Sequence, residues 1–249
     1  MNNPAYALAG ALCEKFIAAE PKAAARALES LATHEILLLI GHLKAQTIIA
    51  ALNPMDPPKA AAVLRRLPFK QAGYVFTRLE VGQSTKIWKE FSTPYQERLK
   101  NALPSSFINL ISGTEQYAPN SLIKWMSTDC VLVKTDAKLG VLVERLKALP
   151  RKKLPAVCFV TGKDGELKGL IRSGEIAFYD EQSLCGSVMS ASPCVHPADN
   201  TEQALALMEQ EQLPLLPVTD ENNAVLGVVS QEAILRAERE KSFWQRLTQ

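Results

Sequence analysis

Apolar residues recur every twelve positions through the first half of the chain. Within each period they are spaced by three, four or seven residues, as in Ile36, Leu39, Ile40 and Leu43, which places them on one face of a short helix. Proline and polar residues separate the periods, as they do where helices start and stop. Each period therefore holds about two helical turns and a corner. The clearest row consists of Leu31, Leu43, Met55, Leu67, Leu79, Phe91 and Leu103.

Helices this short are marginal in isolation, because nucleating a helix is costly. The pattern therefore predicts that they stack on one another as an all-α superhelix over residues 1–119. The sequence does not set the hand of this superhelix.

The second half of the chain repeats itself. Each copy has a polar start, a helix, a strand bounded by proline, a turn, a second strand and another helix, which is a β-α-β-β-α unit used twice. The matching pairs are Met126 with Met189 and Asp136 with Asp199, offset by 63 residues, and Val160 with Val218 and Gly169 with Gly227, offset by 58.

Strand and helix signals give the elements of each copy. The first copy is predicted to have a helix over 137–149, strands over 156–160 and 167–171, and a helix over 173–181. The second is predicted to have a helix over 200–212, strands over 215–219 and 225–229, and a helix over 230–240. The fold class is multidomain, α followed by α/β.

Composition points to an intracellular, non-catalytic protein. The chain has 249 residues and five scattered cysteines, which we interpret as reduced. No uncharged apolar run approaches the ~18 residues that cross a bilayer.

The three histidines are not spaced as metal pairs, and 161–165 is interpreted as a hairpin turn rather than a phosphate loop. The basic clusters at 65–66 and 151–153 lack interleaved aromatic residues, so we expect solvated faces and no nucleic-acid binding.

The repeat carries a family resemblance. The opening Val188-Met189, the strand end at 216–220 and Gly227-Val-Val-Ser230 are similar to CBS motifs, so residues 122–240 resemble a tandem CBS pair. This resemblance implies a regulatory module that pairs into a disc and binds adenine nucleotides in its clefts.

The order of the domains extends the resemblance. Short stacked helices with phrases such as 50–64 and 64–68, followed by a CBS pair, resemble the cytosolic portion of the MgtE-type magnesium transporter family, here without its transmembrane domain. A generic helical repeat fused to a CBS pair is the alternative. We divide the chain into a helical domain (1–119), two CBS copies (122–183 and 184–241) and a helical tail (242–249).

That family senses Mg²⁺ between acidic side chains of its helical domain and its CBS pair. Candidate ligands here are Asp220, Glu221 and Glu232, with Asp56 from the helical domain. The helical domain carries thirteen Lys and Arg against nine Asp and Glu, a net charge of +4. We therefore expect Mg²⁺ as a weakly bound cofactor, in roughly the millimolar range.

In CBS pairs the ribose is held by a Ser or Thr and by an Asp three residues later. The matching positions are Ser230 and Ala233 in the second copy, and Arg172 and Glu175 in the first. Neither pair is complete, so an adenine nucleotide is a candidate cofactor with a partial motif.

Two functions remain open. The first is a cytoplasmic ion-sensing module, with the inner face of the membrane as one location, that gates a magnesium transporter. The second is an adaptor that responds to an adenine nucleotide and binds a protein partner through the helical domain. In either case we expect a homodimer through the CBS pair, in which Ile234 and Leu235 bury surface with Val188 and Met189.

Overall fold

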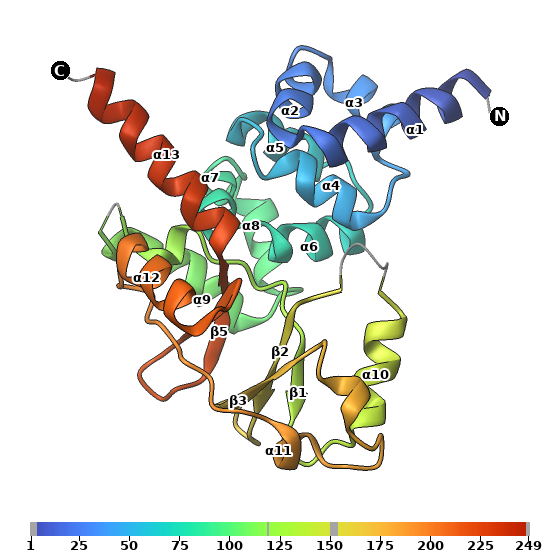
Figure 1. The fold of residues 1–249 in the computed structure, drawn as a ribbon. Coiled ribbons are helices and arrows are strands. Elements are labelled where there is room, and N and C mark those ends of the chain that lie inside the picture. Colours follow the sequence, from blue (N-terminus) through green and yellow to red (C-terminus); the bar gives the residue numbers. More distant parts are fainter. Residues whose placement is uncertain (1–3, 119, 150–153, 248–249) are drawn as a thin grey trace. The chain divides into compact units, whose positions relative to one another are not determined.

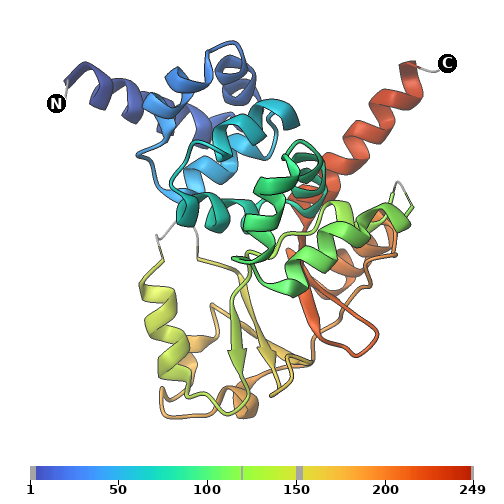
Figure 2. The same ribbon diagram turned by 180° about the vertical axis from the view of Figure 1, so that it is seen from behind.

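The computed structural model describes residues 4–118, 120–149 and 154–247, with side-chain burial for those between 9 and 239. The basic cluster predicted at 151–153 and the last two residues of the predicted tail lie outside the described residues. The chain forms two compact units, residues 1–116 and 117–249, which Figures 1 and 2 show from opposite sides.

The first unit is helical, as the twelve-residue pattern predicts. Helices α3 to α9 begin at positions 33, 45, 57, 69, 81, 93 and 105, so each starts twelve residues after the last. The helices are α1 Pro4–Ala19, α2 Pro21–Glu29, α3 Thr33–Ile40, α4 Ala45–Leu52, α5 Pro57–Leu64, α6 Phe69–Arg78, α7 Val81–Lys89, α8 Thr93–Lys100 and α9 Ser105–Gly113, with the 3₁₀ turn η1 Thr114–Gln116.

These helices stack in two layers. Helix α2 packs on α4 and α4 on α6, whereas α3 packs on α5, α5 on α7 and α7 on α9. The twelve-residue row supplies much of the buried surface between the layers, including Met55 and Leu79. Burying such side chains stabilises the stack by about 1.5–3 kcal/mol each.

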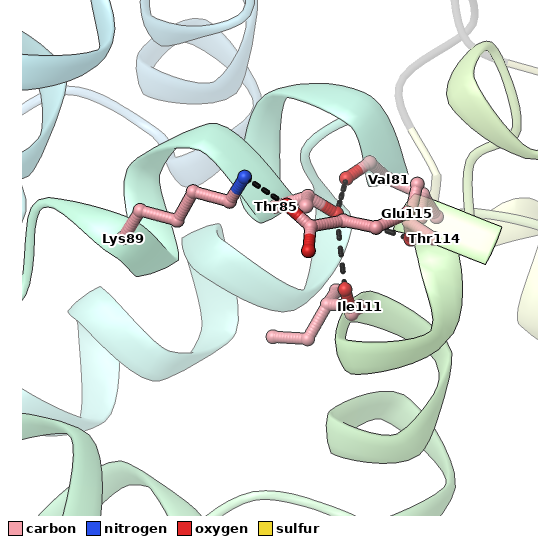
Figure 3. A network of polar contacts seen from close by, with 6 residues as sticks. All are labelled: Val81, Thr85, Lys89, Ile111, Thr114 and Glu115. Carbon is pink, nitrogen blue, oxygen red and sulfur yellow. Dashed lines mark hydrogen bonds and ion pairs between the residues drawn. The ribbon is translucent and has the colours of Figure 1, made fainter. Parts of the chain in front are cut away.

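Buried polar side chains connect helices that are two or three repeats apart. The Gln83 amide donates to the carbonyl oxygens of Leu52 (3.0 Å) and Met55 (2.6 Å), which closes the C-terminal end of α4 against α7. Figure 3 shows the next connection, where the Thr85 hydroxyl lies 3.4 Å from the Ile111 carbonyl oxygen and 3.2 Å from the Thr114 hydroxyl. Lys89 and Glu115 form an ion pair beside it. These contacts fix the register of α7 against α9.

The second unit contains the two predicted copies. Strands β1–β3 form one sheet, in which β1 runs parallel and β3 antiparallel to β2, while β4 and β5 form an antiparallel pair. The first copy comprises η2 Leu122–Lys124, β1 Leu132–Lys134, α10 Leu139–Lys147, β2 Val157–Thr161, β3 Leu167–Arg172 and η4 Ile176–Phe178. The second comprises α11 Cys185–Val188, α12 Thr201–Glu211, β4 Leu215–Thr219, β5 Val225–Ser230 and α13 Gln231–Leu247.

The copies exchange their opening segments. Ser127, at the start of the first copy, bridges Val228 in β5, and Ser190, at the start of the second, bridges Leu170 in β3. The segment 185–189 likewise packs on the core of the first copy, beside Leu142 and Ile171. Each copy is therefore completed by chain that precedes the other.

One predicted element is wrong. The helix expected over 173–181 is reduced to the 3₁₀ turn η4, whereas its counterpart α13 is a 17-residue helix. Ala233, Ile234 and Ala237 are buried in α13, but Ala177 and Phe178 are exposed at η4. A helix over 173–181 would not bury apolar side chains on successive turns, so packing would stabilise it little. Figure 1 shows α13 as a long helix that starts beside α12.

Candidate functional site

The second-copy nucleotide position is built at the start of α13. The Ser230 hydroxyl accepts the N–H of Ala233 at 3.1 Å, so it caps the helix. Ala233 is only 6% exposed and brings no polar side chain. The hydroxyl can still donate to a ligand, but the second acceptor expected for a ribose is missing here.

The first-copy position is different again. Arg172 ends β3 and Glu175 follows in the turn, where the Glu175 N–H donates to the Arg172 carbonyl oxygen at 2.9 Å. Both side chains are half-buried, and no ion pair is found between them. Arg172 is therefore available to an anion, which a guanidinium binds through two parallel hydrogen bonds.

The metal candidates differ in their local surroundings. One carboxylate oxygen of Asp220 accepts the N–H groups of Asn222 (2.9 Å) and Ala224 (2.8 Å), and so holds the hairpin turn between β4 and β5. Glu221 and Glu232 are exposed. Asp56 is exposed at the start of α5, and its own N–H donates to a carboxylate oxygen of Glu29 at 2.7 Å.

Across the described residues, no group of three or more His, Cys, Asp or Glu side chains could hold a metal ion. A Mg²⁺ ion at Asp220 would therefore keep most of its water ligands.

A groove of about 570 Å³ lies in the first copy, between α10 and the chain that follows β3. Sequence reasoning missed it because a full helix was expected at 173–181. Phe178 is 84% and Tyr179 41% exposed beside it. Its apolar wall includes Val143, Leu146, Leu149, Leu154, Ile176 and Tyr179.

The burial of side chains within one chain also changes which residues are expected at the dimer contact. Ile234 is fully buried within its own chain, and Val188 and Met189 pack on the core of the first copy. Only Leu235 of the four expected residues is exposed, at 39%. The expectation was wrong for Ile234, which is buried within its own chain, whereas a contact of Val188, Met189 and Leu235 with a second chain stays a prediction.

Two family profiles match the chain. The profile of the MgtE intracellular N domain matches residues 16–120, and that of the CBS domain matches residues 185–240. The chain combines an MgtE intracellular N domain with a CBS domain. In this domain order it resembles the cytosolic region of MgtE-type magnesium transporters, as the sequence predicts.

Individual proteins agree with the profiles. The magnesium transporter MgtE of Thermus thermophilus is 23% identical over 249 residues, which cover 92% of this chain and 54% of that protein. The chain thus spans about half the length of the curated relative it matches. Within the described residues, no helix is both long and apolar enough to cross a bilayer.

Solved structures share the fold. The cytosolic domain of the Mg²⁺ channel MgtE in complex with ATP is 20% identical, with a TM-score of 0.53, over 90% of this chain and 97% of that one. The soluble part of a magnesium transporter is 14% identical, with a TM-score of 0.56, over 95% of this chain and 99% of that one.

Proposed function

We propose that this chain is a non-catalytic regulatory module that acts on a magnesium-transport system at the inner face of the membrane. The match to a magnesium transporter over 92% of the chain is the observation that carries this proposal. In this proposal the helical domain and the CBS copies act together as a sensor.

Its response to Mg²⁺ is proposed to be weak. Asp220 has one oxygen engaged by the turn, and Glu221 and Glu232 are exposed and held by no neighbouring cation in the ion pairs of the described residues. Flexible, solvated carboxylates bind Mg²⁺ through its water shell, in roughly the millimolar range. The net charge of +4 over residues 1–119 opposes cation binding there.

Limited proteolysis of the segment 117–122 tests the sensor role. We expect millimolar Mg²⁺ to slow cleavage only slightly more than NaCl of the same ionic strength. Strong protection at micromolar Mg²⁺ would show a tight sensor and overturn the weak-response proposal. Identical cleavage in both salts at every concentration would overturn the sensor role itself.

An adenine-nucleotide adaptor is the second candidate. The Ser230 hydroxyl at the start of α13 and the half-buried Arg172 favour it, because together they offer one ribose donor and one phosphate donor. The two residues belong to different copies, so one nucleotide need not contact both. Titration calorimetry with ATP and AMP distinguishes this candidate from the first.

A homodimer is part of either proposal. The groove of the first copy and the exposed Phe178 offer one apolar surface to a second copy of the chain, and a two-fold axis would seat each Phe178 against the partner's groove.

A further inference from the structure

In the helical unit Arg98 lies over one ring of an aromatic pair, and Arg65 lies within Coulombic range of the other. Arg65 follows α5, and Phe69 begins α6. Arg98, on α8, places its guanidinium carbon 4.9 Å from the centre of the Phe69 ring. The Phe69 and Tyr95 rings meet edge to face at 6.3 Å between centres. We call the surface formed by Arg65, Arg66, Phe69, Lys70, Tyr95 and Arg98 the arginine ledge.

The electrostatics of the ledge are one-sided. Burial raises the pKa of the Tyr95 phenol, and the positive charges of Arg98 and Arg65 act in the opposite direction. Both guanidinium groups therefore lie within Coulombic range of one hydroxyl. The neighbouring Glu97 is paired with Lys100 at 2.8 Å. In the described part of the chain, none of the four cations of the ledge takes part in an ion pair.

This surface escaped sequence reasoning. The basic cluster Arg65-Arg66 is not interleaved with aromatic residues in the sequence, so it was interpreted as a solvated face. Folding places Arg98 of α8 over Phe69 of α6, with Tyr95 edge to face against Phe69, although α6 and α8 come from different repeats. A guanidinium stacked on a ring keeps its edge free to bind an oxyanion in a bidentate manner.

The aromatic rings themselves are occupied. Arg98 covers the Phe69 face, and Tyr95 lies 4.8 Å from Phe91. Nucleic acid bases that stack on proteins need open aromatic faces, so the ledge does not suit single-stranded nucleic acid. Arg65, Arg66, Lys70 and Arg98 are all exposed. A small anion on such an open surface stays hydrated, whereas a run of carboxylates can contact more than one cation at a time.

We propose that the arginine ledge is a docking site for an acidic segment of a protein partner. The guanidinium of Arg98, held on Phe69, and that of Arg65 bind carboxylates, while Arg66 and Lys70 add longer-range attraction. The site is made of residues of the first unit and includes none of the Mg²⁺ or nucleotide candidates.

Fluorescence anisotropy with a labelled oligoglutamate peptide tests the proposal on the full chain. We expect binding that weakens as salt rises, since the ion pairs are exposed. Arg98→Gln should weaken binding by about three- to fivefold, the upper range for an exposed ion pair. Arg26→Gln removes one exposed positive charge from α2 and serves as the matched control, for which we expect little change.

A second variant separates geometry from net charge. Phe69→Leu keeps every charge but removes the ring beneath Arg98, and should weaken peptide binding by about twofold. Circular dichroism confirms that each variant is folded. Equal weakening by Arg26→Gln and Arg98→Gln would overturn the proposal, as would binding of phosphatidylserine vesicles or an oligonucleotide with no binding of the peptide.

Discussion

The carbonyl oxygen of Ser127 lies against Gly227, where an added Cβ atom would sit 2.5 Å away. The same relationship recurs between Ser190 and Gly169, also at 2.5 Å. In each case a methionine of the exchanged opening segment, Met126 or Met189, contacts the glycine as well. The glycines of the duplicated pattern are thus the places where one copy's chain crosses the other's strand.

Gly227→Ala and Gly169→Ala should each destabilise the second unit. A methyl group at either position collides with backbone, which cannot move without breaking the Ser127–Val228 or Leu170–Ser190 bridge. We expect the free energy of unfolding to fall by about 1–3 kcal/mol in urea denaturation. Gly174→Ala, at a position with no atom within 4 Å of the added Cβ, is the control and should change it little.

Thr219→Val should stabilise the second unit by about 1 kcal/mol. The Thr219 hydroxyl is fully buried and has no hydrogen-bond partner among the described residues, so valine removes an unsatisfied group with little change of shape. Thr161 is the matched position of the first copy, and its hydroxyl lies 3.5 Å from the Val133 carbonyl oxygen. Thermal unfolding should show that Thr161→Val gives no such gain; equal gains would contradict the argument.

Adenosine, AMP and ATP should bind weakly or not at all in titration calorimetry. The chain lacks the carboxylate side chain that would hold the ribose, and this loss costs about 1.5–3 kcal/mol of binding free energy, or ten- to a hundredfold in affinity. Low-micromolar ATP binding would refute this.

Ser230→Ala should cost about 1 kcal/mol of stability, because it removes the cap of α13. Ala233→Asp would add the carboxylate at a buried position, so its binding must be measured alongside its stability.

Stability should fall as pH rises above about 9, partly through Cys158. Burial raises the pKa of this thiol from 9.0 to about 11. Between these values the unfolded chain loses the proton while the folded chain keeps it, so rising pH favours unfolding by up to about 1.4 kcal/mol per pH unit. Cys158→Ala should flatten this part of the profile in denaturant titrations. Cys194→Ala, at a half-buried cysteine, removes a different thiol while keeping Cys158 and is the control.

Phe178→Glu should shift a dimer towards monomer in light scattering at micromolar concentration. The side chain is 84% exposed in one chain, and a carboxylate in an apolar groove would be desolvated without a partner. Leu38→Glu alters another exposed apolar residue, in the helical unit and at 51% exposure, and should leave the mass unchanged. A wild-type monomer with a folded second unit would contradict the proposed contact.

Much of the fold was predictable because it rests on local patterns. The helix starts follow proline and the twelve-residue apolar row, and the predicted strand at 215–219 coincides with β4. The helix expected over 173–181 was wrong because its helical spacing is not matched by a surface that buries it, and spacing alone does not report burial. The division of residues 122–241 into two copies stays a prediction, although the exchanged segments complicate any single boundary.

The candidate sites were less predictable. Asp220 and Ser230 stay predicted site residues, and their hydrogen bonds to the turn and to the α13 backbone depend on local geometry that the sequence does not report. Arg98 lies 33 residues from Arg65 in the sequence. Only the stacking of repeats brings such residues to one surface, and a periodic sequence does not say which outer positions of its helices coincide.

The two-layer stacking of the helical unit limits how its length can change. Because α4 packs on α2 and α6, and α5 on α3 and α7, losing one repeat would move every later helix into the opposite layer. Side chains that point outward would then face inward, against helices whose surfaces complement a different neighbour. Insertions and deletions that this architecture accepts therefore come in pairs of repeats, so relatives that differ in the size of this domain should differ by an even number of helices.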